Sequence, residues 1–237
     1  RVLLQPAFIL HRRPYRDTSL LLEAFSHEHG RLGLVARGAA SARSRLKSML
    51  QPFVPLLLSW SGAGDLVALT AAEETGRPAP LPPGQVLAGL YVNELLVRLL
   101  PRQDSLPGLF AAYRTLLAEL AAAADAEPPL RRFEKCLLEE LGYGLSLDRE
   151  AVSGMPIVAE QRYCYVLDRG PLVADSGVPG VPISGRGLLA LRDGMLADPT
   201  VLREVKHLTR AALAEQLRGR VLKTRELYRA KREPWPE

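Results

Sequence analysis

The chain has 237 residues, 47% hydrophobic and 24% charged, which is typical of folded globular domains and excludes a disordered or fibrous chain. Its two cysteines are too few for a secreted disulfide scaffold or a four-cysteine zinc site. No apolar run reaches the ~18 residues of a membrane span, and basic side chains interrupt the first 20 residues. We therefore expect no signal peptide, no membrane partner and a cytoplasmic location, close to the nucleoid if the partner is DNA.

Five segments in the first 76 residues are predicted to be short strands with turn residues between them, and the third also shows apolar alternation. They cover residues 3–13, 18–26, 31–37, 53–60 and 66–70. Between the third and fourth strands, residues 41–49 predict a short helix capped by Ser41. A five-stranded barrel with a helix at this position is the plan of an OB-fold. The sequence therefore predicts an α+β chain that begins with an OB-fold nucleic-acid-binding domain over residues 1–76.

The segment RGAASARSRLKSMLQPFVP, residues 37–55, joins the third strand to the fourth and contains no acidic residue. Its basic side chains are Arg37, Arg43, Arg45 and Lys47. An uncompensated positive segment at the edge of an OB-fold face would neutralise phosphates and release counterions. The segment is therefore a candidate DNA-binding surface, and the alternative is a solvent-exposed helix face without a ligand.

Charge is also unevenly distributed along the whole chain. Residues 1–50 hold 9 Lys or Arg against 3 Asp or Glu, and residues 198–237 hold 10 against 6. The intervening residues are acidic to neutral, although the net charge is +5. Two basic ends favour a polyanionic partner. The alternative is that the exposed arginines only keep the protein in solution.

After a Pro- and Gly-rich hinge at residues 77–84, the apolar period becomes helical. We expect a helical domain over residues 85–237, with an irregular Gly- and Pro-rich insertion at 145–183. Its helices are predicted at 85–100, 106–124, 129–144, from Asp198 to Gly219, and at 223–231.

Motifs of catalysis are absent from the sequence. There is no GxxxxGK[ST], GxGxxG or GxSxG pattern. His27 and His29 flank Glu28 in a turn, where exposure to solvent is favoured over a metal site. We therefore expect a binding protein and not an enzyme, with no catalytic residue, no cofactor and no metal.

Several stretches together resemble the bacterial recombination mediator family RecO, of the proteobacterial type. They are ILHRRPYRDTSLLLEAFSHEHGRLGLVARGA, LKSMLQPFVPLLL, GLYVNELLVRLL, LRRFEKCLLEELGYG and LKTRELYRAK, in family order over nearly the whole chain. The resemblance implies an N-terminal OB-fold followed by a helical domain. It also implies binding of single- and double-stranded DNA, annealing of complementary strands, and a place in recombinational DNA repair in the RecF pathway. The implied protein partners are RecR, the acidic C-terminal tail of the single-stranded DNA-binding protein and, indirectly, RecA.

One feature departs from the family pattern. Many RecO-like proteins carry two cysteine pairs that bind zinc, and the first pair would fall near Glu150 and Ser153. Only Cys164 lies nearby, so we predict no zinc and expect packing or polar contacts to hold this region instead.

The candidate DNA-binding residues form two sets. The first adds Arg12, Arg13, Tyr15 and Arg16, at the end of the first strand, to the basic segment, with Tyr15 the candidate for base stacking. The second is a C-terminal stripe of Arg203, Lys206, Arg210, Lys223 and Arg225. This stripe either extends the DNA surface or completes a pocket for the partner's tail, and the sequence leaves both open beside a solvent-exposed helix face.

The resemblance implies that the helical domain receives the partner tail, which in this family is acidic and ends in Phe with a free carboxylate; such a ligand needs a cation and an apolar slot. The candidates are Leu130, Arg131, Arg132 and Lys135, with Arg131 expected to project from the polar side of its helix. The alternative for Arg131 is an exposed side chain paired with Glu134.

The resemblance implies a DNA-binding protein that anneals strands and mediates RecA loading with RecR, whereas composition and spacing by themselves indicate only a basic binding protein of two parts. One alternative is a general single-stranded nucleic-acid-binding OB protein, for example an RNA binder. The other is a nuclease or a different metal-dependent enzyme with unrecognised ligands.

Overall fold

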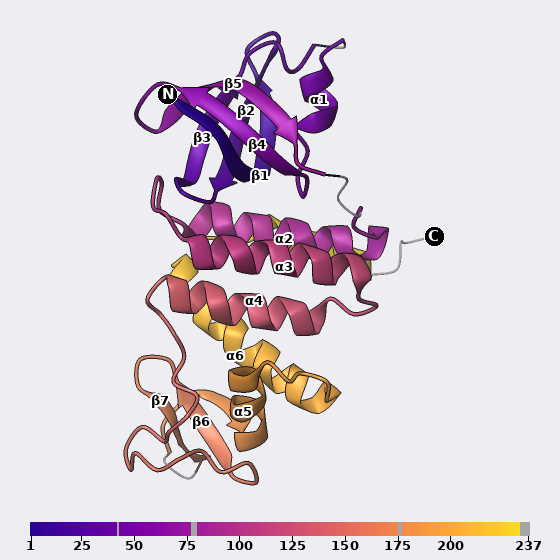
Figure 1. Cartoon of the computed structure of the whole chain (residues 1–237). Coiled ribbons are helices and arrows are strands. Elements are labelled where there is room, and N and C mark those ends of the chain that lie inside the picture. Colours follow the sequence, from indigo (N-terminus) through magenta and orange to yellow (C-terminus); the bar gives the residue numbers. More distant parts are fainter. Residues whose placement is uncertain (42, 77–79, 175–176, 233–237) are drawn as a thin grey trace. The chain divides into compact units, whose positions relative to one another are not determined.

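The computed structural model describes residues 1–41, 43–76, 80–174 and 177–232, with side chains through residue 227 (Figure 1). Residues 77–79 of the predicted hinge and residue 42 of the basic segment lie outside the described residues. The described chain divides into two compact units. One comprises residues 1–122 and the segment that begins at Leu222, and the other comprises residues 123–221.

The first unit begins with a closed barrel in the strand order β1-β2-β3-β5-β4. The strands are β1 (Val2–Tyr15), β2 (Ser19–Ser26), β3 (Gly30–Ala36), β4 (Pro55–Ser61) and β5 (Leu66–Glu74). Neighbouring strands are antiparallel except β3 and β5, which pair in parallel over three residues, Gly33–Val35 with Leu66–Ala68. This order and the α+β class confirm the predicted OB-fold barrel.

Alternating apolar side chains explain why these segments close into a barrel. Leu32, Leu34 and Ala36 of β3 point inward, as do Leu22 of β2 and Leu58 of β4, and all five are buried in one core cluster. Because side chains alternate across a strand, one outward-facing residue lies between each inward-facing residue and the next.

Helix α1 (Arg45–Met49) lies between β3 and β4 and is shorter than the predicted helix at 41–49. The predicted cap at Ser41 is wrong, since Ser44 is the residue that precedes the helix. The backbone N–H of Ala40 donates a hydrogen bond to the carbonyl of Thr18 at 2.8 Å. This hydrogen bond holds the chain before α1 against the β1–β2 turn, and the helix begins only at Arg45.

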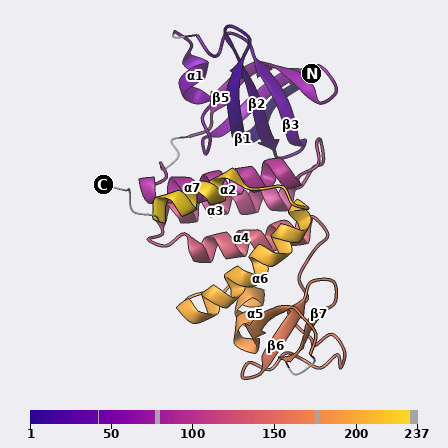
Figure 2. The same cartoon turned by 180° about the vertical axis from the view of Figure 1, so that it is seen from behind.

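Three helices share the first unit with the barrel: α2 (Pro83–Leu99), α3 (Pro107–Ala122) and α7 (Lys223–Arg232). Figure 2 shows α7 beside α2. Phe110 of α3 packs against the outward rings of Phe8 and Phe25, with centroids 5.5 and 5.4 Å apart. Asn93 of α2 donates to the carbonyl of Leu10 and accepts from the Tyr113 hydroxyl. The compact unit therefore extends past residue 76, and the predicted domain boundary at the hinge stays a prediction.

The second unit contains helices and a small antiparallel sheet in the order β7-β6-β8. Its elements are α4 (Glu127–Glu140), β6 (Arg162–Val166), β7 (Gly170–Val173), β8 (Val181–Ser184), α5 (Gly185–Asp193) and α6 (Pro199–Leu217). The prediction that residues 145–183 are irregular is wrong where these strands lie. Tyr163 and Tyr165 of β6 alternate into a core with Ile183 of β8. The strands are only four or five residues long, which hides their period among glycines and prolines.

Helix α6 confirms the predicted start, because the Asp198 side chain accepts hydrogen bonds from the N–H groups of Thr200 and Val201. Arg218 and Gly219, both with positive φ, end it.

Candidate nucleic-acid interface

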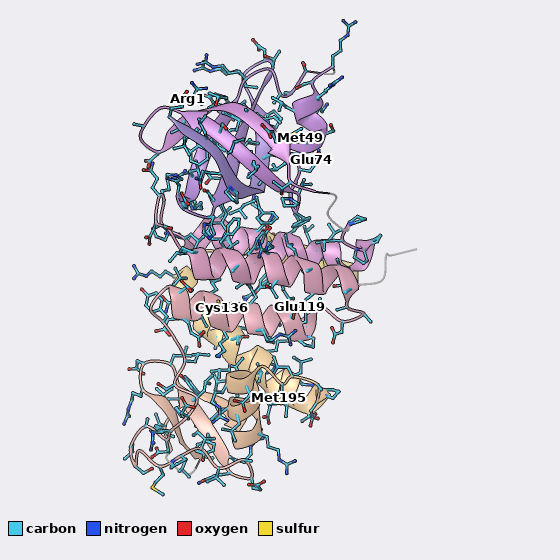
Figure 3. All side chains as sticks on the ribbon, viewed as in Figure 1. Arg1, Met49, Glu74, Glu119, Cys136 and Met195 are labelled. Atoms are coloured by element: carbon cyan, nitrogen blue, oxygen red, sulfur yellow. The ribbon has the colours of Figure 1, made fainter. Side chains whose placement is uncertain are left out.

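The basic segment leaves β3 and runs through α1 on the barrel. Arg37, Arg43, Arg45 and Lys47 are all exposed. Figure 3 marks Met49 at the end of α1, where long side chains surround the helix. Among the described residues, none of these four side chains forms an ion pair with a carboxylate. The barrel therefore presents four uncompensated positive charges within eleven residues of sequence.

Arg12 holds this segment in place. Its Nη1 donates to the carbonyl of Lys47 at 3.0 Å and to that of Leu50 at 3.4 Å. These carbonyls belong to the C-terminal end of α1, where the helix dipole favours a cation. Arg13 of the same strand is exposed and points away from this contact, since neighbouring residues in a strand face opposite sides. Arg12 is thus engaged by α1, whereas Arg13 is open to solvent.

The β1–β2 turn brings the aromatic candidate into the same region. The guanidinium carbon of Arg16 lies 5.2 Å from the ring centroid of Tyr15, within cation–π range. Arg16 has φ of 53°, so its backbone is in the left-handed region. This conformation reverses the chain tightly and places the two side chains together.

A surface pocket of about 390 Å³ opens beside this pair. Its walls come from three stretches that are distant in sequence: the β1–β2 turn, the end of β3 and the start of β5. The lining includes Tyr15, Arg16, Thr18, Val35, Arg37 and Leu66. The structure therefore brings three predicted DNA-binding residues, Tyr15, Arg16 and Arg37, to one pocket.

Sequence reasoning missed the apolar wall of this pocket. Leu66, at the first position of β5, is 46% exposed, and Val35 and Ala68 lie outward on the paired strands β3 and β5. An exposed leucine directly after the turn at residues 61–65 was the available signal. Its partners follow only from the parallel pairing, which no local pattern specifies.

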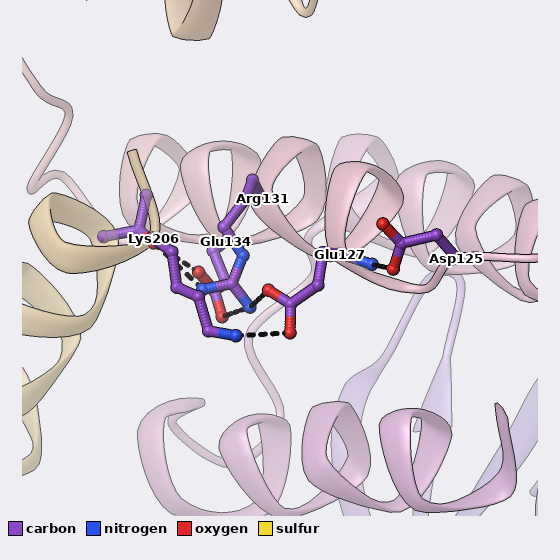
Figure 4. A network of polar contacts seen from close by, with 6 residues as sticks. Asp125, Glu127, Arg131, Glu134 and Lys206 are labelled. Carbon is purple, nitrogen blue, oxygen red and sulfur yellow. Dashed lines mark hydrogen bonds and ion pairs between the residues drawn. The ribbon is translucent and has the colours of Figure 1, made fainter. Parts of the chain in front are cut away.

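The predicted tail-binding residues on α4 lie in a different environment. Arg131 is only 2% exposed, so the expectation that it projects from the polar side of its helix is wrong. Its Nη2 lies 3.0 Å from Oε1 of Glu134, a fully buried residue, and its Nη1 donates to the Thr209 hydroxyl at 3.4 Å. Figure 4 shows Arg131 and Glu134 beside Glu127 and Lys206, and Nζ of Lys206 lies 2.6 Å from Oε1 of Glu127. The pairing with Glu134 that the sequence suggested is present, but inside the protein.

The neighbours of Arg131 are also engaged within the second unit. Leu130 is buried, so it offers no open apolar slot. Arg132 contacts the carbonyl of Gly194 at 3.5 Å, and Lys135 donates to the carbonyl of Arg192 at 3.2 Å. Both cations therefore lie at the C-terminal end of α5, where they stabilise its last carbonyls.

Comparison with known proteins agrees with this architecture. Residues 2–76 match the family described as "Recombination protein O N terminal", and residues 84–226 match "Recombination protein O C terminal". The chain is 49% identical over 230 residues to a "DNA repair protein RecO" of Methylococcus capsulatus, covering 97% of this chain and 94% of the relative. It is 44% identical over 232 residues to a protein of the same description from Halorhodospira halophila, covering 97% of both chains. The chain belongs to the RecO family. It is therefore a member of a DNA repair family.

In this RecO-family chain, polar contacts hold the turn where the first cysteine pair was sought. The Glu150 carboxylate accepts a hydrogen bond from the backbone N–H of Ser153, and the Glu150 N–H donates to the carbonyl of Met155 at 2.8 Å. Arg149 donates to the carbonyl of Gly154 at 2.9 Å. Within the described ranges, no group of three or more His, Cys, Asp or Glu side chains is placed to hold a metal ion. The prediction that this chain binds no zinc stays a prediction.

The C-terminal basic stripe is divided by its contacts. On α6, Arg203 and Arg210 are exposed, whereas Lys206 is paired with Glu127. On α7, Lys223 is exposed, whereas Arg225 is half-buried with its Nε and Nη2 atoms enclosed and not hydrogen-bonded to described residues. Arg203, Arg210 and Lys223 are therefore the members with charge available to a ligand.

Glu94 of α2 fixes the start of α7. Its carboxylate accepts hydrogen bonds from the backbone N–H groups of Lys223 and Thr224 and from the Thr224 hydroxyl, all at 2.8–2.9 Å. Burial raises the pKa of Glu94, but these hydrogen bonds and that from Arg98 outweigh it and hold the pKa below its ordinary value of 4.5. The charged carboxylate thus caps α7.

No helix in the described part of the chain is long and apolar enough to cross a bilayer.

Proposed function

We propose that this protein binds single- and double-stranded DNA through the basic segment of its barrel and anneals complementary strands without catalytic turnover. With RecR, it would mediate the loading of RecA onto single strands coated by the single-stranded DNA-binding protein, whose acidic tail it would bind. The observation that carries the DNA-binding proposal is the run of four exposed, unpaired cations beside a pocket with an aromatic wall. The site of this activity would be the cytoplasm, at the nucleoid.

The mechanism is electrostatic. Phosphates bound along Arg37, Arg43, Arg45 and Lys47 would release their condensed counterions, which favours association most at low salt. A surface that screens two backbones lowers the repulsion between strands while leaving their base edges free to pair. Annealing of this kind needs no general acid, nucleophile or metal.

The partner tail keeps a narrower set of candidates. Burial removes Leu130 and Arg131 as direct contacts, and Arg132 and Lys135 already bind carbonyls at the end of α5. Lys135 also lies 3.4 Å from Glu139, so an acidic tail would have to compete with that pair. We retain Arg132 and Lys135 as the proposed contacts, since both are only half-buried.

The first experiment is fluorescence anisotropy of a labelled single strand over a salt series, with wild type and a variant in which Arg43, Arg45 and Lys47 are changed to Ala. We expect weaker binding and a shallower slope of log affinity against log salt. The slope should fall by about 0.7 per lost phosphate contact, and so by up to about 2 for three contacts.

The matched control removes the same charge elsewhere, through Arg114, Arg169 and Arg218 to Ala, which are exposed and not paired with a carboxylate among the described side chains. If both triple variants lose the same slope, net charge and not the barrel segment governs binding. If neither loses affinity, the barrel segment is a solvent-exposed helix. Stronger binding of an RNA strand of the same sequence would favour a general RNA-binding OB protein.

A further inference from the structure

Part of the outer face of the barrel, at the start of β3, is already occupied by the chain itself. On strands β2 and β3, Glu23 accepts hydrogen bonds from Arg31 at 2.8 Å and from Arg102 at 2.6 Å. Arg102 belongs to the connection between α2 and α3, which lies against the barrel. A Cβ atom on Gly30 would lie 1.8 Å from the carbonyl oxygen of Asp104, so this connection packs directly on the start of β3. No strand of DNA has room there.

The open remainder of this face is the pocket at the other end of the same strands. OB-folds bind oligonucleotides on the face of strands 2 and 3 and through the flanking loops. Here that face narrows to Val35 and Ala68, with the β1–β2 turn on one side and Leu66 on the other. A volume of about 390 Å³ lies within the range of pockets that enclose small ligands.

The lining has the chemistry of a site for a planar aromatic group that carries negative charge. Tyr15 offers a ring, Val35 and Leu66 offer apolar walls, and Arg16 and Arg37 offer guanidinium groups. No acidic side chain is among the residues that line it. A base with its flanking phosphates is such a group, because every base has a π-face and arginine binds phosphate in a bidentate manner.

We propose that this pocket takes one unstacked base of a single strand, stacked on Tyr15, with the adjoining phosphates on Arg16 and Arg37. This inference rests on the proposed DNA binding and assigns it a subsite. The strand then continues over the basic segment, since Arg37 is both a wall of the pocket and the first residue of that segment. A duplex keeps its bases paired and cannot insert a base into the pocket. The pocket therefore favours single-stranded DNA, whereas the positive charge of the surface alone would bind single and double strands.

The test uses the full chain and three DNA probes of equal length: an oligo(dT) strand, the same strand with abasic sites throughout, and a duplex. Ala68→Phe fills the pocket without changing charge. Ala71→Phe is the matched control, because it places the same ring on the exposed part of the same strand. Binding is measured by anisotropy at a fixed salt concentration.

Wild type should bind oligo(dT) about fivefold or more tightly than the abasic strand, which is the lower range for stacking of one base on an aromatic ring. Ala68→Phe should abolish this difference and leave duplex binding unchanged, while Ala71→Phe should behave as wild type. Tyr15→Leu, which removes the ring and leaves the pocket open, should reduce the difference in the same direction.

Equal binding of oligo(dT) and the abasic strand by wild type overturns the subsite, even if the filled variant does not fold. Equal loss of single-strand and duplex affinity in Ala68→Phe overturns it as well. A different result would contradict the proposed function itself: wild-type protein that binds none of the three DNA probes.

Discussion

The arginines of the basic segment on the barrel and Arg131 of α4 in the second unit have opposite roles. On the barrel, Arg37, Arg43 and Arg45 are exposed and unpaired, so their charge is available to a ligand. In the second unit, Arg131 is buried among side chains of α4 and α6, and its charge is neutralised by Glu134.

The difference follows from the acids around each arginine. Arg131 has Glu127 four residues before it and Glu134 three residues after it, so both carboxylates share its helix face. The barrel segment has no acid between residues 37 and 55. A guanidinium that enters a core needs a carboxylate, because an uncompensated buried charge costs several kcal/mol. Local acid content therefore separates Arg131, which stabilises the fold, from the arginines of the basic segment, which are left for a ligand.

Breaking the buried pair should have the largest effect on stability. Arg131→Ala leaves the Glu134 carboxylate buried without a counterion, and we expect the free energy of unfolding to fall by about 3–5 kcal/mol. Urea unfolding followed by far-UV circular dichroism measures this change. Changing Arg43, Arg45 and Lys47 to Ala should alter stability by less than about 1 kcal/mol, because exposed charges contribute little.

A double variant tests whether the charge or the packing of this pair matters. Arg131→Met combined with Glu134→Leu removes both charges and keeps apolar volume, so it should be more stable than Arg131→Ala. If the free energy of unfolding of Arg131→Ala lies within about 1 kcal/mol of the wild-type value, the ion pair does not stabilise the second unit, and the contrast with the barrel arginines disappears.

The cap on α7 should give a smaller and pH-dependent effect. Glu94→Gln weakens three hydrogen bonds to the helix start, and we expect a local loss of about 1–2 kcal/mol at pH 7. Because the pKa of Glu94 is lowered by folding, its contribution is fully present above pH 4.5 and is lost as pH falls through the folded value. Hydrogen exchange of the first amides of α7 measures this.

The control for this cap is Glu73→Gln, the same change at an exposed residue of β5. Exchange of the α7 amides should be as slow in Glu73→Gln as in wild type. The difference between Glu94→Gln and wild type should shrink as pH falls below 4.5 and disappear below the folded pKa of Glu94, and a difference that does not shrink would mean that the carboxylate charge is not what fixes α7.

Strand-like segments separated by turn residues were enough to predict the barrel but not the small sheet of the second unit. The inward set of β3, Leu32, Leu34 and Ala36, repeats over a strand long enough to show period two. β7 and β8 have four residues each, which is too short for a period to stand out between glycines and prolines. Their place depends on pairing with β6, a non-local contact.

The sequence was enough to predict which residue types form the candidate site, but not how those residues are arranged in space. The basic segment and Tyr15 could be identified because charge and ring type are visible in the sequence. The pocket could not, since Val35 and Leu66 meet through the parallel pairing of β3 with β5, and Tyr15 reaches them through the pairing of β1 with β2 and of β2 with β3. Likewise, the burial of Arg131 needed the partner helix α6, which supplies Thr209.

The last contrast lies within the C-terminal stripe itself. Arg203 and Arg210 of α6 are exposed, and neither is paired with a carboxylate among the described side chains, whereas Lys206 between them is bound to Glu127. Changing both arginines to Ala should lower the salt slope of single-strand binding by at most about 1.4, less than the barrel triple variant. Lys206→Ala should lower it less than either arginine change, because its charge is already compensated.

The control for this stripe is Arg169→Ala, which removes one exposed charge of the same unit that is not paired with a described carboxylate, so slope changes are compared per arginine. If the α6 pair behaves like this control, the stripe does not touch DNA and the barrel is the whole interface. If the α6 pair loses as much slope as the barrel triple variant, α6 carries the main contacts. In that case exposure alone, and not the absence of acids along a segment, would decide which arginines of this chain bind phosphate.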